Sequence, residues 1–249
     1  MLTIIGIGPG KKEGMTIEAY HALEKCDCIV GYTVYVELVR ELFPDKQFYT
    51  TPMTKETERC EWAIGQAKAG LHIAMVCSGD SGVYGMAGLI CELADDTVEV
   101  EILPGVTAAC SGAAVLGAPL THDFAVISLS DRLTPWEKIR RRLQAAAMGD
   151  FVICLYNPAS KGRPDHLKKA CDILLAEGIE KDRVCGIVQN IGREGEQKQI
   201  MTLAGLRDFP ADMFTTVYIG NSMTNKYGMR MVTPRGYQND KGVCLRLRQ

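Results

Sequence analysis

Short apolar runs alternate with longer amphipathic stretches along the whole chain of 249 residues. Several of these runs are continuously apolar, as in strands whose two faces are both covered. They predict strands at residues 2–7, 28–31, 47–50, 73–77, 98–103, 124–128, 150–156, 183–189, 197–202 and 215–219. The stretches between them predict helices at residues 16–25, 57–69, 85–94, 107–116, 136–147 and 163–177.

This alternation of strands and helices predicts an α/β fold with mainly parallel sheets. The segment G-A-P-L at residues 117–120 interrupts a predicted helix, and a new strand begins soon after it. We therefore expect two stacked α/β domains, residues 1–118 and 121–249. A cleft between the domains, at the carboxyl ends of strands, is the expected place for a ligand or cofactor.

Composition and charge exclude several classes of partner. Apolar residues make up 47% of the chain and charged residues 23%, as in an ordinary soluble globular protein. The formal net charge of -2 gives no general attraction to nucleic acid. No apolar stretch reaches the roughly 18 residues of a membrane span, and no secretory signal opens the chain. We expect a cytoplasmic protein without a membrane or nucleic-acid partner.

The ten cysteines are scattered rather than grouped as metal ligands. Only Cys26 and Cys28 are close in sequence, and C-x-C lacks the two-residue gap typical of zinc or redox sites. Most of the others, among them Cys154 and Cys185, lie in apolar runs, where cysteine packs as a small hydrophobic residue. We expect no metal site and a reducing compartment.

The first candidate site is the glycine turn G-I-G-P-G at residues 6–10, directly after the first predicted strand. A tight structural turn is one interpretation, because glycine permits positive φ. A dinucleotide-binding G-x-G-x-x-G would have glycine where Lys11 stands, and no G-K-S or G-K-T follows. The turn therefore argues against both common nucleotide motifs.

Two further loops of small residues follow strands in the same half of the chain: S-G-D-S-G-V-Y-G at residues 78–85 and P-G-V-T-A at residues 104–108. Each leads into a predicted helix, whose first N–H groups can meet a ligand. Asp80 and Thr107 are equally explained as N-cap residues. Because the carboxyl ends of parallel strands lie along one edge of a sheet, we expect the three loops to form one site.

As an ordered set, these loops resemble those of the tetrapyrrole methylases, two-domain methyltransferases that use S-adenosylmethionine. The resemblance covers essentially the whole chain. Three further stretches are similar to the members that act on precorrin-3B or cobalt-factor III in cobalamin synthesis: V-G-Y-T-V-Y at 30–35, D-F-A-V-I-S-L-S-D at 123–131 with T-P-W at 134–136, and L-Y-N-P at 155–158. The resemblance implies methylation at position 17 of the tetrapyrrole, ring contraction by expulsion of the position-20 carbon, S-adenosylhomocysteine as product, and a homodimer.

Matched motif by motif, the resemblance also implies a set of cofactor-binding residues. They are Pro9, Ser78, Gly79, Asp80, Val83, Thr107, Ala108, Tyr156, Asn157, Asn190, Ile191, Thr215 and Thr216. Asn157 stands where the family usually has methionine. The T-H-R that often opens the second domain of the family reads T-H-D here, at residues 121–123.

Candidates for catalysis follow from the chemistry that the resemblance implies. Methyl transfer needs mainly orientation and exclusion of water, whereas ring contraction needs proton movement and stabilisation of a developing oxyanion. Ser128, Ser130 and Asp131 follow a predicted strand and are the first candidates, although a helix-capping segment is an equal interpretation. His122 is a further candidate for catalysis, with a hydrogen-bonded structural role as the alternative. The other three histidines are interpreted as structural or surface residues.

The carboxylates of a tetrapyrrole call for cationic side chains around its site. The basic residues next to the candidate loops are Lys11, Lys12, Arg132, Lys161 and Arg163. The basic run at residues 138–142 is interpreted as a solvated helix face rather than as an RNA site.

Three alternatives remain open from the sequence. The chain could methylate another precorrin position or ribosomal RNA on the same fold, or it could be a non-catalytic regulator that binds S-adenosylmethionine. A regulator would need the three loops but not the cationic rim.

Overall fold

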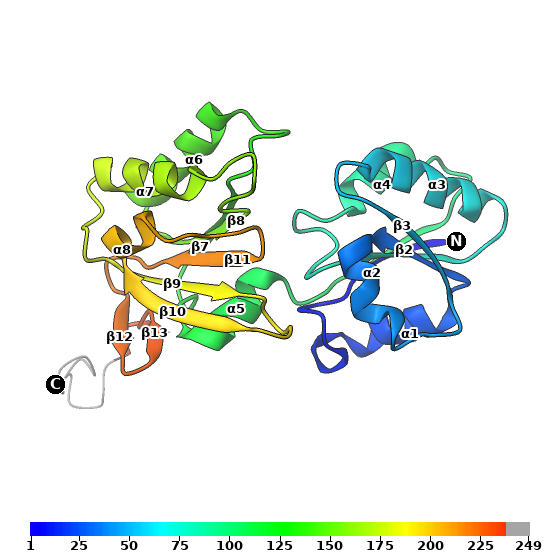
Figure 1. Cartoon of the computed structure of the whole chain (residues 1–249), viewed down its shortest axis with the longest axis horizontal. Helices are drawn as coiled ribbons and strands as arrows, with labels where there is room; N and C mark the ends of the chain where they lie inside the picture. The colour runs from blue at the N-terminus through cyan, green and yellow to red at the C-terminus, as the bar shows by residue number, and fades with distance from the viewer. Residues whose placement is uncertain (238–249) are drawn as a thin grey trace. The chain divides into compact units, whose positions relative to one another are not determined.

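The computed structural model describes residues 1–237, and its contacts divide the chain into two compact units (Figure 1). Unit 1 comprises Met1–Ser111 and the short return segment Ile191–Glu194, and unit 2 comprises Gly112–Asn190 and the chain from Gly195 onward. The change of unit falls inside helix α5 (Ala108–Leu116), a few residues before the division expected from the sequence. The return segment had not been anticipated.

Unit 1 is built on a sheet of five parallel strands in the order β3-β2-β4-β1-β5. These strands are β1 (Leu2–Gly6), β2 (Cys28–Tyr32), β3 (Gln47–Thr51), β4 (Ile73–Cys77) and β5 (Val100–Leu103). Side chains alternate between its two faces, so Leu2 and Ile4 enter one core, whereas Ile5 and Ile7 enter the other. Both faces are therefore apolar, which explains the continuous hydrophobic runs.

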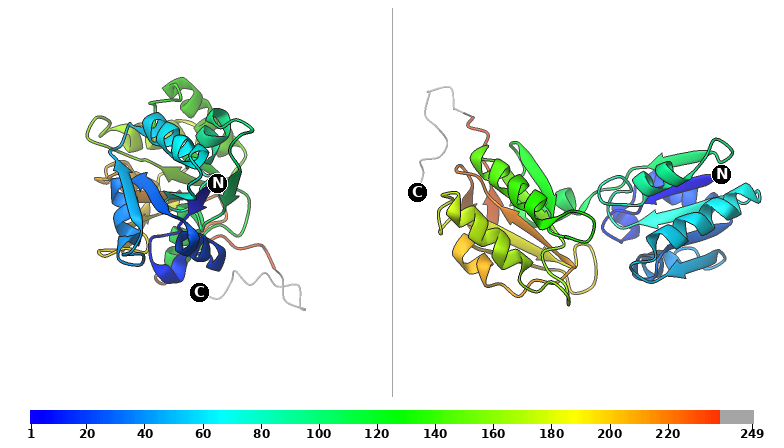
Figure 2. Two further views of the ribbon diagram at one scale, coloured as in Figure 1. Left: turned by 90° about the vertical axis from the view of Figure 1, so that its right-hand side faces the viewer. Right: turned by 90° about the horizontal axis from the view of Figure 1, so that it is seen from above.

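Helices cover both faces of this sheet (Figures 1 and 2). Buried residues of α3 (Glu56–Lys68) and α4 (Ala87–Leu93) complete the core that holds Leu2. Buried residues of α1 (Ile17–Lys25) and α2 (Thr33–Arg40) complete the core that holds Ile5. A 3-10 turn, η1 (Lys12–Gly14), lies between β1 and α1, and Thr16 caps α1 by accepting the N–H of Ala19 at 3.1 Å.

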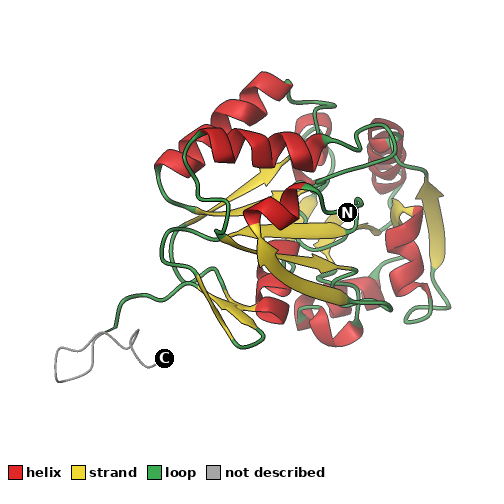
Figure 3. Cartoon of the chain, turned by 60° about the vertical axis from the view of Figure 1, so that its left-hand side comes forward, coloured by secondary structure: helices red, strands yellow, loops and turns green. Residues whose placement is uncertain are grey.

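Unit 2 has a second five-stranded sheet in the order β10-β9-β11-β8-β7. Its strands are β7 (Phe124–Ser128), β8 (Val152–Tyr156), β9 (Val184–Gln189), β10 (Gln197–Thr202) and β11 (Thr215–Ile219). Helices α6 (Trp136–Met148), α7 (His166–Ala176) and α8 (Leu203–Arg207) pack on one face, where Figure 3 shows α6 and α7 across the yellow strands. Leu116 of α5 and Met231 of β13 (Arg230–Val232) lie against Gly186 on the opposite face.

The predicted α/β fold class is confirmed, with a parallel sheet in unit 1, but the expectation of a mainly parallel sheet is wrong for unit 2. Within the five-stranded sheet of unit 2, β7 and β8 pair in parallel, whereas β9 is antiparallel to both β10 and β11. The connection from β9 to β10 spans only residues 190–196, which is too short for the crossover that a parallel pair needs. Strand β11 then enters between β8 and β9, antiparallel to both.

A small three-stranded sheet completes unit 2. Strand β12 (Asn225–Tyr227) forms a hairpin with β13, which also pairs in parallel with β6 (Gly117–Ala118). These short strands and the helices α2 and α8 were not among the predicted elements.

Candidate functional site

The three glycine loops of unit 1 meet at one edge of its sheet, as predicted. They follow β1, β4 and β5, and β1 lies between the other two with all three strands parallel. Gly8 and Gly79 exchange backbone hydrogen bonds of 3.0 and 2.8 Å, which joins the first loop to the second. The edge is therefore one connected surface of backbone and small side chains.

Glycine is required where these loops approach one another. A Cβ atom on Gly6 would lie 2.6 Å from the backbone nitrogen of Gly105 and 2.8 Å from the carbonyl oxygen of Gly79. Gly8 and Gly79 also have φ of +63° and +71°, which side chains other than glycine rarely adopt. The structure thus explains the glycines by close packing of the loops themselves.

Asp80 ties the second loop to the third. One of its carboxylate oxygens accepts the N–H of Gly82 at 2.8 Å and that of Val83 at 3.0 Å, and the other accepts the N–H of Gly105 at 2.9 Å. Helix α4 begins only at Ala87, so Asp80 is not its N-cap. Its carboxylate shapes the edge by holding backbone groups from two loops.

The remaining residues predicted for this edge differ in exposure. Pro9, Ser78, Thr107 and Ala108 are half-buried, and Val83 is 37% exposed. Thr107 directly precedes α5 and its carbonyl oxygen accepts the N–H of Ser111 at 3.0 Å.

Arg193, which the sequence did not single out, also belongs to this edge. It lies on the return segment and donates a hydrogen bond to Ser78 Oγ at 2.8 Å, and its guanidinium carbon lies 5.8 Å from the centre of the Tyr35 ring. A Cβ atom on the neighbouring Gly192 would lie 2.6 Å from the Cβ atom of Pro9. The only signal in the sequence was its place two residues after Ile191, itself a predicted cofactor residue.

Burial shifts the pKa of this arginine and of its aromatic neighbour. Removal from water lowers the pKa of Arg193, and the nearby Tyr35 hydroxyl acts in the opposite direction. Removal from water also raises the pKa of Tyr35, against the effect of the Arg193 charge.

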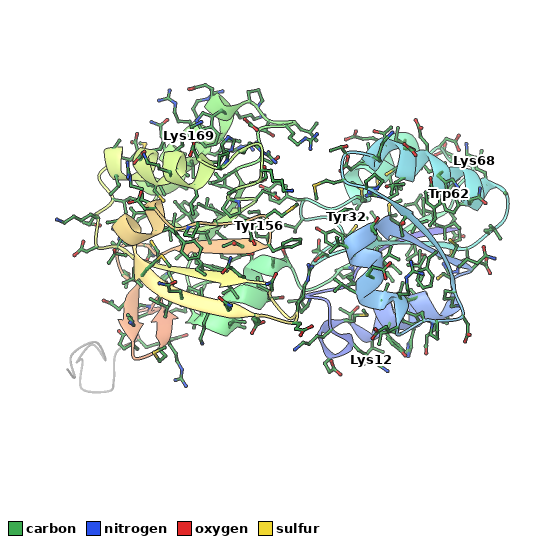
Figure 4. The ribbon with its side chains drawn as sticks, in the orientation of Figure 1. Lys12, Tyr32, Trp62, Lys68, Tyr156 and Lys169 are labelled. Carbon is green, nitrogen blue, oxygen red and sulfur yellow. The ribbon has the colours of Figure 1, made fainter. Side chains whose placement is uncertain are left out.

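A second set of predicted residues meets at one edge of the unit 2 sheet. Tyr156, labelled in Figure 4, ends β8. Asn157 follows β8, and Asn190 follows β9. Thr215 begins β11 and pairs with Gln189 at the end of β9. Because β11 is antiparallel to its neighbours, its first residues lie at the edge where β8 and β9 end.

The backbone conformation explains why asparagine stands at positions 157 and 190. Asn157 has φ of +52° and Asn190 has φ of +51°, a region that asparagine tolerates better than most residues. Asn157 Nδ2 also donates to Ser128 Oγ at 3.0 Å. A methionine at position 157 would lose both properties. Thr215 and Thr216 are buried, and Thr215 Oγ1 donates to Asp212 at 2.7 Å.

Ser130 and Asp131 form a polar cluster with two residues from further along the chain. Arg163 donates to Ser130 Oγ at 2.5 Å and lies 3.5 Å from Asp131 Oδ1. On the other side, His166 Nε2 lies 3.6 Å from Asp131 Oδ2. Ser128 is linked to the same segment, because its Oγ accepts the N–H of Ser130 at 3.2 Å. Ser128, Ser130 and Asp131, predicted from one stretch of sequence, therefore lie together.

His122 is not part of this cluster. It lies before the start of β7, whereas Ser128 ends that strand, so the length of β7 separates them. A strand of five residues spans roughly 13 Å, which is too far for joint action on one proton.

The predicted cationic residues also separate into two groups. Lys11, Arg132 and Lys161 are exposed. Lys12 instead donates to the Tyr20 hydroxyl at 3.2 Å and lies 4.4 Å from the centre of its ring (Figure 4). Arg163 is bonded to Ser130 and lies beside Asp131, so its positive charge is already partly balanced by a residue of the protein.

The described cysteines behave mainly as core residues. Seven of the nine within residues 1–237 are buried, and only Cys91 and Cys110 are exposed. Cys244 lies outside the described residues. Within residues 1–237 no three His, Cys, Asp or Glu side chains are grouped so that they could hold a metal ion. The same part of the chain contains no helix long and apolar enough to cross a membrane.

Three glycine loops at the edge of a parallel sheet, followed by a second α/β unit, are the features to compare with known protein families. A family model described as Tetrapyrrole (Corrin/Porphyrin) Methylases matches residues 1–207. The chain therefore belongs to the tetrapyrrole methylases, and the predicted resemblance is confirmed.

Relatives within this family are similar along nearly the whole chain. The chain is 48% identical over 240 residues to the probable cobalt-factor III C(17)-methyltransferase of Salmonella typhimurium, covering 95% of this chain and 99% of that protein. It is 40% identical to the precorrin-3B C(17)-methyltransferase of Sinorhizobium, covering 90% and 89%. It is 43% identical to the cobalt-factor III methyltransferase of Priestia megaterium but spans only 45% of that longer protein.

Solved structures agree with this assignment. The methyltransferase CobJ has a TM-score of 0.86 and 36% identity, covering 94% of this chain and 99% of that chain. A uroporphyrin-III C-methyl transferase from Thermus thermophilus, crystallised with S-adenyl homocysteine, has a TM-score of 0.69 at 18% identity, covering 88% and 96%. The second likeness shows the shared fold.

Proposed function

We propose that this chain is an S-adenosylmethionine-dependent C-methyltransferase that acts at position 17 of precorrin-3B or cobalt-factor III, with ring contraction, in cobalamin biosynthesis. The observation that supports this most is the nearly end-to-end similarity to relatives whose names state that activity. A likeness of the same extent to the methyltransferase CobJ supports it independently of sequence motifs.

The edge of the unit 1 sheet fits S-adenosylmethionine because it presents backbone groups rather than bulky side chains. The glycines pack so tightly that larger residues are excluded, so a ligand at this edge would meet backbone and small side chains. In unit 1 we assign cofactor contacts to Pro9, Ser78, Gly79, Asp80, Val83, Thr107, Ala108 and the return-segment residue Ile191. In unit 2 we assign them to Tyr156, Asn157, Asn190, Thr215 and Thr216. The bound cofactor supplies an electrophilic methyl group.

The Ser130–Asp131 cluster supplies what ring contraction requires. Ser130 Oγ accepts a hydrogen bond from Arg163, which leaves its own O–H free to donate to an oxygen of the macrocycle. The Asp131 carboxylate is 38% exposed and can hold or accept a proton from the substrate. Ser128 orients the segment through the N–H of Ser130. His122, at the other end of β7, is the weakest of the four catalytic candidates.

Carboxylates of the macrocycle would be met by the exposed cations. Lys11, Arg132 and Lys161 are available for this role without loss of an internal ion pair. Lys12 and Arg163 remain candidates, although each would have to exchange or share its present partner.

We also propose a cytoplasmic homodimer that has no nucleic-acid partner. The family resemblance supports the dimer, and the net charge of -2 supports the absence of a nucleic-acid partner. Analytical ultracentrifugation at micromolar concentration tests the dimer, and a monomer at all concentrations would refute it.

Incubation of the purified protein with methyl-labelled S-adenosylmethionine and either precorrin-3B or cobalt-factor III tests the function. We expect NMR and mass spectrometry to find one labelled methyl group at position 17 of a contracted ring. Asp131→Asn should abolish contraction, whereas Asp182→Asn, an exposed residue at the opposite edge of the unit 2 sheet, should not. Label at another position would indicate a different precorrin methylase, and cofactor binding without any transfer would indicate a regulator.

A further inference from the structure

The imidazole of His166 is buried against the segment that carries the proposed catalytic residues. His166 is the first residue of α7 and is 6% exposed. Its Nδ1 atom lies 2.8 Å from the carbonyl oxygen of Leu129. A carbonyl oxygen can only accept a hydrogen bond, so Nδ1 carries a proton and donates it. In the neutral ring the lone pair is therefore on Nε2.

That second nitrogen faces Asp131. His166 Nε2 lies 3.6 Å from Asp131 Oδ2, while Arg163 lies 3.5 Å from Asp131 Oδ1. The side chains of His166 and Arg163 are only 7% and 21% exposed, whereas that of Asp131 is 38% exposed. A buried imidazole and a half-buried guanidinium thus lie beside the two oxygens of a partly exposed carboxylate.

His166 and Asp131 can bond to each other only through a proton that lies between them. The Trp136 ring packs against the imidazole with 4.7 Å between ring centres, and the Lys169 ammonium group lies 5.9 Å from the centre of that indole. A carboxylate and a neutral Nε2 are both acceptors and cannot bond to each other. One proton between them makes a hydrogen bond in either location, while Arg163 keeps the opposite carboxylate oxygen in place.

We propose that His166 is a positioning residue that is linked to Asp131 by a hydrogen bond through Nε2 and so sets the orientation of that carboxylate. This inference rests on the proposed function in that Asp131 is assigned to ring contraction. It assigns a role to a histidine that the sequence indicated only as structural or surface. The competing explanation is that His166 merely anchors α7 to Leu129.

Two substitutions separate these explanations, because each keeps one nitrogen position. Asparagine places an amide nitrogen near the position of Nδ1, and glutamine places one near that of Nε2. His166→Asn should keep the bond to Leu129, with a melting temperature within about 2 °C of the unsubstituted protein, yet lower kcat about 10- to 100-fold. His166→Gln should lose the Leu129 bond and melt several degrees lower, about 2–4 °C, yet keep kcat within about threefold of the unsubstituted protein. The KM for S-adenosylmethionine should not change in either variant.

Nitrogen-15 NMR of the histidine rings tests the same inference without turnover. The His166 signals, assigned by their loss in His166→Asn, should show a protonated Nδ1. The Nε2 signal should shift in Asp131→Asn and stay unchanged in the control Asp182→Asn.

Two results would overturn the inference. One is a kcat that falls in both variants in proportion to the fall in melting temperature. The other is an Nε2 signal that does not shift in Asp131→Asn. If the unsubstituted protein methylates neither substrate, the proposed function fails, and the NMR result alone decides the inference.

Discussion

Asp80 holds two of the three loops at the unit 1 edge, so its replacement should loosen both. One carboxylate oxygen accepts from Gly82 and Val83, and the other accepts from Gly105 at 2.9 Å. Asp80→Asn keeps an oxygen for the first two N–H groups but turns an NH₂ group toward Gly105. That backbone N–H then faces another donor. Asp80→Ala removes all three bonds.

The magnitudes follow from these bonds. A partly buried N–H left without an acceptor costs about 1–3 kcal/mol, which is the expected loss for Asp80→Asn. Three hydrogen bonds at about 1 kcal/mol net each give a loss of about 3 kcal/mol for Asp80→Ala. Because the loops form the proposed cofactor surface, a distortion that costs about 1.4 kcal/mol of binding would weaken S-adenosylmethionine affinity about tenfold.

Each unit contains one of the two tryptophans, which allows unit 1 to be followed alone. Trp62 in α3 stacks on Tyr49 with ring centres 3.9 Å apart, and Trp136 lies in α6. In a Trp136→Phe background, urea unfolding followed by fluorescence reports the free energy of unfolding of unit 1. Calorimetric titration with S-adenosylmethionine on the same samples measures binding.

Asp95→Asn is the matched control for this experiment. Asp95 also accepts a backbone N–H, that of Thr97 at 3.1 Å. Its other contact is an exposed ion pair of 2.7 Å with Lys68, so it joins no second loop of the edge, and loss of a surface pair costs about 0–1 kcal/mol. We expect a much smaller change in the urea midpoint for this variant. Equal changes in midpoint for Asp80→Asn and Asp95→Asn would refute the reasoning that Asp80 connects the loops.

Two further predictions concern glycine and cysteine. Gly6→Ala brings a Cβ atom within 2.6 Å of the Gly105 nitrogen and should lower the free energy of unfolding by about 1–3 kcal/mol. Gly65→Ala lies at an exposed helix position with nothing within 4 Å, and it should raise the free energy of unfolding by about 0.5–1 kcal/mol. Urea midpoints that move in the same direction would contradict this. Burial raises the pKa of Cys26 to about 11, so iodoacetamide at pH 8 should modify exposed Cys110 and leave Cys26 intact until the pH nears 11 or the protein unfolds. Peptide mapping by mass spectrometry checks this, and labelling of Cys26 in folded protein at pH 8 would be inconsistent with its burial.

The strands were predictable because a strand that is buried on both faces appears in the sequence as a continuous apolar run. The runs at 73–77, 124–128, 197–202 and 215–219 coincide with β4, β7, β10 and β11 to the residue. Helix α2 was missed because its sequence, T-V-Y-V-E-L-V-R, is rich in residues with low helix propensity. Val36 and Val39, three residues apart, are both fully buried against the sheet, so packing overrides propensity there.

The candidate site was predictable in parts but not as an arrangement. Ser130 and Asp131 were predicted from one stretch and Arg163 from another, yet for different roles. The contact of Arg163 with Ser130 and Asp131 depends on the packing of α7 near the end of β7. No pattern in neighbouring residues of the sequence predicts that packing. The same packing buries His166 and turns it toward Asp131.

The sequence by itself determined the strands of the two five-stranded sheets, most of the helices, the three glycine loops with their common edge in unit 1, and the family. These follow from the period of apolar residues, from the backbone freedom of glycine and from motif order, all of which are local. Only the tertiary structure decided the antiparallel entry of β11, the return of Arg193 to unit 1, and the pairing of His166 with Asp131. Those features join residues distant in the chain, and their energies come from contacts that exist only after folding.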